Sequence, residues 1–185
     1  SNIVQIEDGT LDITAGGGAA NSLKTHESDV PGGGMPQNGE KPDGESRPQM
    51  GEKPDGENMP QHTTTDESGT STKGIKAGGG MYLNGGTYQI DSADDSIHSN
   101  ANITIADGTY TLATGDDGVH ADDALIVNGG TITVTESYEG LEGLTVTIND
   151  GTIDITASDD GINTAGEKME LNGGYIPVSY THLTL

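Results

Sequence analysis

The chain has 185 residues and a formal net charge of −23, from 30 Asp and Glu against 7 Lys and Arg. A nucleic-acid binder that relies on phosphate contacts needs a basic face, so this charge excludes that class. The sequence has no apolar run long enough for a membrane-spanning helix and no Cys for a disulfide or a thiolate metal site. Phe and Trp are absent, which argues against a wide core. The chain starts at Ser1 without a signal-peptide pattern and reads as a mature or truncated piece.

A glycine followed by Thr or Tyr recurs at nearly constant spacing. The last five copies are separated by 22, 22, 21 and 23 residues, and the full set is Gly9, Gly86, Gly108, Gly130, Gly151 and Gly174. Apolar residues stand three and five positions before each glycine and two and four positions after it, which is the alternation of β-strands. A third apolar position follows eleven residues after the glycine in four copies, at Ile97, Val119, Leu141 and Ile162.

Three short strands and three turns in about 22 residues are the unit of a parallel β-helix. We therefore predict an all-β fold: a right-handed, single-stranded parallel β-helix of about six coils over residues 1–178. Tyr88 and Tyr110 fall at inward positions and are predicted to lie in the core. A β-sandwich would not keep one period and three apolar columns.

The first coil is interrupted between its second and third strands. The step from Ile13 to Ile75 is 55 residues longer than the equivalent step from Ile90 to Ile97. The extra segment is rich in Gly, Pro and Glu, and we predict that residues 16–71 form a disordered surface insertion. Residues 179–185 follow the last inward column and are predicted to be a non-native tail.

Two polar columns precede and follow the third-strand position. In register, the first contains Asp95, Asp117, Glu139 and Asp160, and the second contains His98, His120, Glu142 and Asn163. Neighbouring coils lie about 4.8 Å apart, so stacked carboxylates repel unless they point into water, take up protons or share a cation. No Lys or Arg is found within these columns, although Lys73 and Lys76 lie one coil before Asp95.

Oxygen ligands from successive turns suit Ca²⁺, which we predict as the cofactor. The predicted ligands are Asp94, Asp95, Asp116, Asp117, Asp122, Asp123, Glu139, Glu142, Asp159, Asp160 and Asn163. The alternative is a solvated acidic turn in which Asp-Gly pairs supply only turn geometry. His98 and His120 can bind a transition metal, but such histidines more often hydrogen-bond to a nearby Asp or to a ligand hydroxyl.

The polar turns resemble those of a known family. The segments are Asp94-Asp-Ser-Ile-His-Ser-Asn100, Asp116-Asp-Gly-Val-His-Ala-Asp-Asp123, Ser137-Tyr-Glu-Gly-Leu-Glu142 and Ser158-Asp-Asp-Gly-Ile-Asn163, with Lys73-Gly-Ile-Lys76 upstream. They are similar to the bacterial carbohydrate-binding β-helix family, whose members resemble pectate lyases in fold, bind calcium and are associated with cellulose and pectin-type polysaccharide. Ser96 departs from the Gly or Ala usual in the first motif.

This resemblance implies a calcium-dependent module, extracellular or on the bacterial cell surface, with pectin-like or cellulose-type polysaccharide as its partner. The predicted carbohydrate contacts are His98, His120, Tyr138, Lys73 and Lys76. A polysaccharide lyase would need a Lys or Arg base beside Ca²⁺. Two Lys without an Arg to grip the substrate are weak support for that class, so we predict no enzymatic activity. A structural surface solenoid remains a third alternative, and sugar binding with and without calcium separates it from the others.

Overall fold

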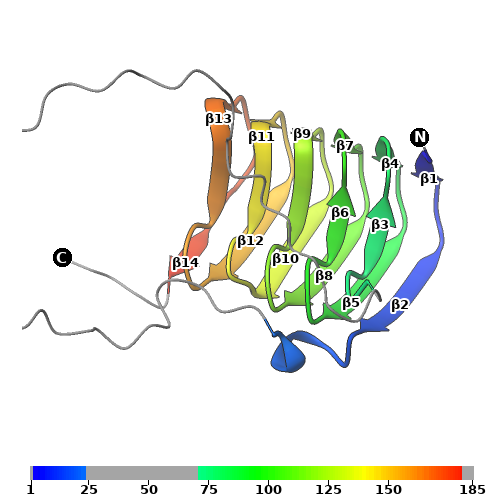
Figure 1. Ribbon diagram of the computed structural model, residues 1–185. Coiled ribbons are helices and arrows are strands. Elements are labelled where there is room, and N and C mark those ends of the chain that lie inside the picture. Colours follow the sequence, from blue (N-terminus) through cyan, green and yellow to red (C-terminus); the bar gives the residue numbers. More distant parts are fainter. Residues whose placement is uncertain (1, 24–70, 181–185) are drawn as a thin grey trace, which may run out of the picture. The chain divides into compact units, whose positions relative to one another are not determined.

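The alternating apolar segments form β-strands throughout the part of the chain that the structure describes, residues 2–23 and 71–180. In this computed structural model, each strand pairs in parallel with the equivalent strand of the neighbouring coil (Figure 1). The described residues make about five turns of an all-β parallel solenoid. The only helix among them is a single 3-10 turn, η1 (Ala19–Asn21). The predicted fold class is confirmed.

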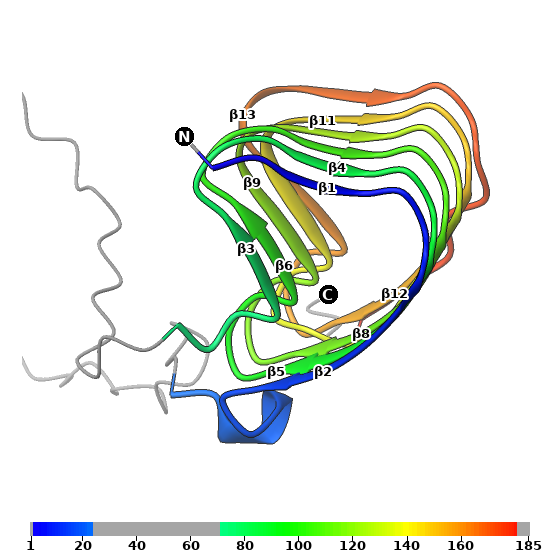
Figure 2. The same ribbon diagram turned by 90° about the vertical axis from the view of Figure 1, so that its right-hand side faces the viewer.

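Two parallel sheets form the walls of the solenoid, seen end-on in Figure 2. The larger sheet contains β1 (Val4–Ile6), β3 (Ile75–Ala77), β4 (Met81–Leu83), β6 (Ile97–Ser99), β7 (Ile103–Ile105), β9 (Val119–Val127), β11 (Leu141–Ile148) and β13 (Ile162–Leu171). The smaller sheet contains β2 (Thr10–Ala15), β5 (Thr87–Ser92), β8 (Thr109–Thr114), β10 (Thr131–Glu136), β12 (Thr152–Ala157) and β14 (Val178–Tyr180).

The corner between the third strand of one coil and the first strand of the next changes along the solenoid. β6 and β7 are separate strands, whereas β9, β11 and β13 run through this corner without a break. The register in which β11 pairs with β9, and that in which it pairs with β13, both shift between Gly143 and Thr145. Such a bulge bends a strand locally, so the later coils turn the corner within one strand instead of through a loop.

The core is a narrow stack of inward-facing side chains. One column runs through β5, β8, β10 and β12 as Ile90, Leu112, Val134 and Ile155. Tyr88 and Tyr110 stack in the same sheet with ring centroids 4.4 Å apart and are buried, as predicted. Their hydroxyl groups donate to the carbonyl oxygens of Gly85 and Asp107, at 2.8 Å in each case. The phenols therefore fill the core without leaving a buried polar group unpaired.

The recurring glycine lies in the turn that leads into the smaller sheet. All six copies have φ between 90° and 123°, at Gly9, Gly86, Gly108, Gly130, Gly151 and Gly174. L-residues with a side chain rarely adopt this conformation, which explains why the same position requires glycine in every coil.

The ends of the predicted insertion are partly described. Within residues 16–23, Ala19 N donates to Asp91 Oδ1 at 2.7 Å and Ser22 Oγ donates to Gly115 O at 3.2 Å. Residues 24–70 of the predicted insertion and residues 181–185 of the predicted tail lie outside the described residues. Residues 178–180 form β14, which pairs with β12. Among the residues described, no helix is long and apolar enough to cross a membrane.

Candidate functional site

The two predicted polar columns stand next to each other at the start of the third strand of each coil. Strand pairing places one column in register as Lys76, His98, His120, Glu142 and Asn163. The other column lies three residues earlier in each coil and consists of Lys73, Asp95, Asp117, Glu139 and Asp160. The predicted stacking is therefore confirmed, and both columns begin with a lysine.

Lys73 neutralises the first carboxylates of these columns. Its Nζ lies 2.5 Å from Asp95 Oδ2 and 3.0 Å from Asp94 Oδ2, and the Lys73 and Asp95 side chains are only 11% and 1% exposed. Burial acts to lower the pKa of Lys73, but the two carboxylates outweigh it and raise this pKa above its usual value. No Lys is predicted within these columns from the sequence; the structure shows that Lys73 and Lys76 continue them by one coil and that Lys73 pairs with the first acids.

His98 and His120 are held by the acids three residues before them. Nδ1 of His98 lies 2.8 Å from Asp95 Oδ2, and Nδ1 of His120 lies 2.8 Å from Asp117 Oδ2. The ring centroids are 5.0 Å apart. On the opposite edge of the rings, Nε2 of His98 and Nε2 of His120 lie 3.9 and 3.4 Å from Asp122 Oδ1. Each ring therefore bridges a buried acid and an exposed one.

His120 neutralises the middle of the columns. Its Nδ1 also lies 2.9 Å from Glu142 Oε2. Burial acts to lower the pKa of His120, but the hydrogen bonds to Asp117 and Glu142 raise it to about 10. The hydrogen bond to His120 lowers the pKa of Glu142, whereas burial raises the pKa of Asp117. At neutral pH, His120 is therefore an imidazolium between two carboxyl groups.

The last two coils carry acids without a cationic side chain in either column. Asn163 Nδ2 donates to both carboxylate oxygens of Glu139, at 2.9 and 3.1 Å, and lies 3.5 Å from Glu142 Oε1. Burial and the charges of Glu142, Asp160 and Asp159 raise the pKa of Glu139 to about 7, although the Asn163 amide acts against this. Asp159 and Asp160 are exposed. Glu142 also contacts His120, whereas the side chain of Glu139 hydrogen-bonds to an amide.

We expect this uncompensated acid to make stability depend on pH. A carboxyl group whose pKa is raised in the folded state stabilises the fold less as it ionises, so the contribution of Glu139 falls between its ordinary pKa of 4.5 and about 7. Glu139→Gln should therefore reduce the fall in melting temperature between about pH 5 and pH 8, measured by circular dichroism with a chelator present. The exposed Glu136, changed to Gln, controls for loss of one surface charge. An undiminished fall in Glu139→Gln would contradict the assignment.

The candidate ligand groups differ in how well they match calcium. Asp94, Asp95 and Asp116 bring three carboxylate oxygens within 4.8 Å of one another, but the Lys73 ammonium already contacts two of them. The other compact groups among the described residues include an imidazole nitrogen: Asp95, His98 and His120, and Asp117, His120 and Glu142. Ca²⁺ prefers oxygen ligands, so these mixed groups suit it less well.

Glu139, Glu142 and Asn163 fit calcium better. Their side-chain ends meet around one amide group, and a rotation of that amide exchanges its nitrogen for its oxygen. The set then offers only oxygen ligands, and neither column has an ammonium group at this level, although Glu142 Oε2 also contacts His120 Nδ1 at 2.9 Å. Asp122 and Asp123, also predicted as ligands, are exposed residues of β9, and Asp122 lies beside the two histidines instead.

The predicted carbohydrate contacts differ in accessibility. His98 is buried, His120 and Tyr138 are partly exposed, and Lys76 is exposed. A side-chain hydrogen bond with Asp159 raises the pKa of Tyr138 to about 12. Lys73 is engaged by its two carboxylates, so of the two predicted lysines only Lys76 presents its side chain to solvent.

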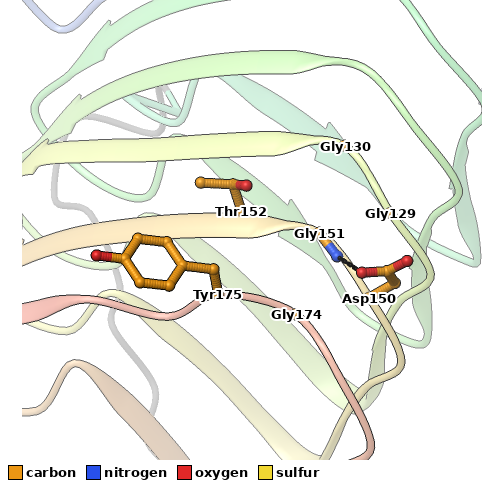
Figure 3. Close-up of a pocket in the computed structure, with 7 residues that line it drawn as sticks. All are labelled: Gly129, Gly130, Asp150, Gly151, Thr152, Gly174 and Tyr175. Carbon is orange, nitrogen blue, oxygen red and sulfur yellow. Dashed lines mark hydrogen bonds between the residues drawn. The ribbon is translucent and has the colours of Figure 1, made fainter.

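A shallow hollow of about 460 Å³ lies at the recurring glycine turn (Figure 3). It is lined by Gly129, Gly130, Asp150, Gly151, Thr152, Gly174 and Tyr175. Tyr175 is 69% exposed, and it stands at the position that is Thr in each earlier coil. An open aromatic ring beside a hydroxyl and a carboxylate is suitable for contact with a sugar. The sequence interpretation did not assign this site; the Tyr in place of Thr was the only signal for it.

These observations define an acidic parallel β-solenoid with a polar, partly buried ladder of side chains at one corner of each coil. A family model described as carbohydrate-binding domain-containing protein matches residues 1–118 and 116–185, and the chain belongs to this family. Comparisons with curated proteins and with solved structures found no match. Membership supports a role in carbohydrate binding and confirms that part of the predicted resemblance.

Proposed function

We propose that this domain is a non-catalytic module that binds an acidic, pectin-like polysaccharide through Ca²⁺, outside the cell or on the bacterial cell surface. The observation that carries the proposal is the convergence of Glu139, Glu142 and Asn163 in the last two coils, whose own column positions hold no cationic side chain. An acidic protein repels a uronate polymer unless cations lie between them. Calcium at this end of the columns supplies that charge and can share its remaining coordination positions with uronate oxygens.

The environment of Lys73 supports a binding role over a lyase role. A lyase base must accept the proton next to the uronate carboxylate, so it must be unprotonated when substrate binds. Lys73 is held as an ammonium by Asp94 and Asp95 and is almost fully buried. It therefore serves the fold, and Lys76 is the only lysine on this corner that can reach a ligand.

The binding of polygalacturonate is expected to require calcium and Glu139. Pull-down with this polymer should succeed in millimolar Ca²⁺ and fail with a chelator. Glu139→Gln should weaken binding, whereas Glu136→Gln should not, because Glu136 lies outside the columns. Calcium at a hundredfold excess over its dissociation constant should also raise the free energy of unfolding by about 2.7 kcal/mol.

Two tyrosines distinguish the surfaces that can contact the polymer. Tyr138→Ala should weaken binding if the polymer lies over the acidic corner, and Tyr175→Ala should do so if it lies in the glycine-turn hollow. Cellulose serves as the uncharged comparison. Binding to polygalacturonate that persists in chelator, or calcium-independent binding to cellulose alone, would contradict the cation-bridged mode.

A further inference from the structure

An exposed aromatic residue ends a column of threonines on the outer face of the smaller sheet. Strand pairing places five exposed residues in register: Thr10, Thr87, Thr109, Thr131 and Thr152. Tyr175 continues this column next to Thr152 and is 69% exposed. We propose that Tyr175 and the hollow beside it bind an uncharged sugar ring of a polysaccharide without calcium. This site shares the carbohydrate role of the proposed function but does not rest on its calcium site.

The hollow and the acidic corner are separate surfaces. The hollow lies at the start of β12, at Thr152, whereas the acidic residues Asp159 and Asp160 follow the end of this strand at Ala157. The six residues of β12 span about 17 Å, so one sugar ring cannot contact both places.

The backbone of Tyr175 is fixed by the neighbouring strand. Tyr175 N donates to Gly151 O at 2.9 Å, and Tyr175 O accepts from Ile153 N at 2.9 Å. In Figure 3 the side chains of Thr152 and Tyr175 lie on the same side of neighbouring strands. A residue held in this way can meet a ligand without the entropic cost of ordering a loop.

The hollow supplies room and polar groups beside the ring. Its volume of about 460 Å³ falls within the range of about 300–1,000 Å³ that is typical of small-molecule sites. Thr152 offers a hydroxyl group, and the exposed Asp150 offers a carboxylate. Asp150 Oδ1 accepts the N–H of Gly151 at 2.8 Å, which orients this carboxylate. A carboxylate can accept several hydrogen bonds, so Asp150 retains the capacity to accept a sugar hydroxyl.

The chemistry of the lining favours an uncharged sugar. The apolar C–H face of a pyranose ring can pack on the tyrosine ring, while its hydroxyl groups meet the polar groups at the edge. Asp150 is the one charged group among the seven lining residues. It repels a uronate carboxylate, and no lining Lys or Arg compensates for this repulsion. The hollow therefore selects against the acidic sugars that calcium can bridge to the corner.

The threonine column extends this surface along the solenoid. Neighbouring coils lie about 4.8 Å apart, so a polymer that stacks one ring on Tyr175 can continue over the hydroxyl groups of Thr152 and Thr131. The hollow is shallow and open to solvent, which suits a chain passing over it better than an enclosed small molecule. An extended, uncharged polysaccharide is therefore the class of ligand that fits.

Calorimetric titration of the full chain with cellohexaose, xylohexaose and mannohexaose, in the presence of a chelator, tests this proposal. We expect at least one of these uncharged sugars to bind more tightly than hexagalacturonate. Tyr175→Ala should reduce this affinity at least about tenfold, whereas Tyr175→Phe keeps the ring and should bind like the unmodified chain. Tyr82→Ala is the matched control, because Tyr82 is a 42% exposed residue of β4 in the larger sheet. Equal affinity of Tyr175→Ala and Tyr82→Ala, or no binding of any uncharged sugar, would overturn the proposal.

A second matched pair tests the carboxylate. Asp150→Ala removes the proposed hydroxyl acceptor and should weaken binding about three- to tenfold. Asp107→Ala removes a carboxylate that accepts the N–H of Gly108 at the same distance of 2.8 Å, two coils earlier and outside the hollow. An equal loss in both variants would mean that only the turn geometry matters, against the proposal. Because the chelator removes calcium, failure of this site is distinguishable from failure of calcium-dependent binding to polygalacturonate.

Discussion

Replacing Lys73 with Met is expected to destabilise the fold by about 3–5 kcal/mol, because breaking a buried ion pair leaves its partner charge uncompensated. Asp95 is 1% exposed and faces Lys73 Nζ at 2.5 Å. Without the ammonium, this carboxylate keeps its hydrogen bond with His98 Nδ1 and accepts the backbone N–H of Asp117 from the next coil. Urea unfolding followed by circular dichroism near pH 7 measures the loss.

Lys76→Met is the matched control. Lys76 lies three residues further along, heads the other polar column and is exposed. Exposed ion pairs contribute about 0–1 kcal/mol, so the free energy of unfolding of this variant should be close to that of the unmodified protein. Equal destabilisation by the two substitutions would mean that net charge matters, and not the buried pair.

Tyr110→Ala is the second large effect that we expect, with a loss of about 3–5 kcal/mol as for other large aromatic side chains in cores. Tyr110 is fully buried, stacks on Tyr88 and donates to the carbonyl oxygen of Asp107. The substitution opens a cavity in a core with no Phe or Trp to fill it. Thermal unfolding should show a lower melting temperature.

Two further variants separate the contributions at this position. Tyr110→Phe keeps the ring and loses only the hydroxyl, so it should cost about 1 kcal/mol. Tyr82→Ala removes a tyrosine that is 42% exposed and should cost less than the buried substitution. A small effect of Tyr110→Ala would show that the coils close over the cavity, contrary to the stacked core described above.

The polar corner changes in character along the solenoid. An ammonium, Lys73, neutralises the first acids; an imidazolium, His120, neutralises the middle; and an amide, Asn163, meets the last. Compensation for the carboxylates therefore weakens from β3 toward β13. This gradient is the reason that calcium is proposed at the last coils.

The repeat in the sequence was sufficient to predict the solenoid and the alignment of its columns. Inward residues alternate with period two, so the burial of Tyr88 and Tyr110 followed from their place relative to the glycine. The stacking of His98 on His120 followed from the constant coil length, because parallel coils bring equivalent positions together. Local rules acting on a regular repeat determine these features.

Side-chain contacts at the corner were decided by the tertiary structure. The repeat predicts that Lys73 lies one coil before Asp95. The ion pair forms only because the long Lys73 side chain turns toward the neighbouring coil, where both side chains are nearly buried. Likewise, Asp122 was identified as an acid past the third strand, yet only the continuous course of β9 through the corner sets its carboxylate against both histidine rings. Sequence spacing specifies which coil a residue occupies, whereas backbone bends and side-chain rotamers, which depend on neighbouring coils, specify which atoms meet.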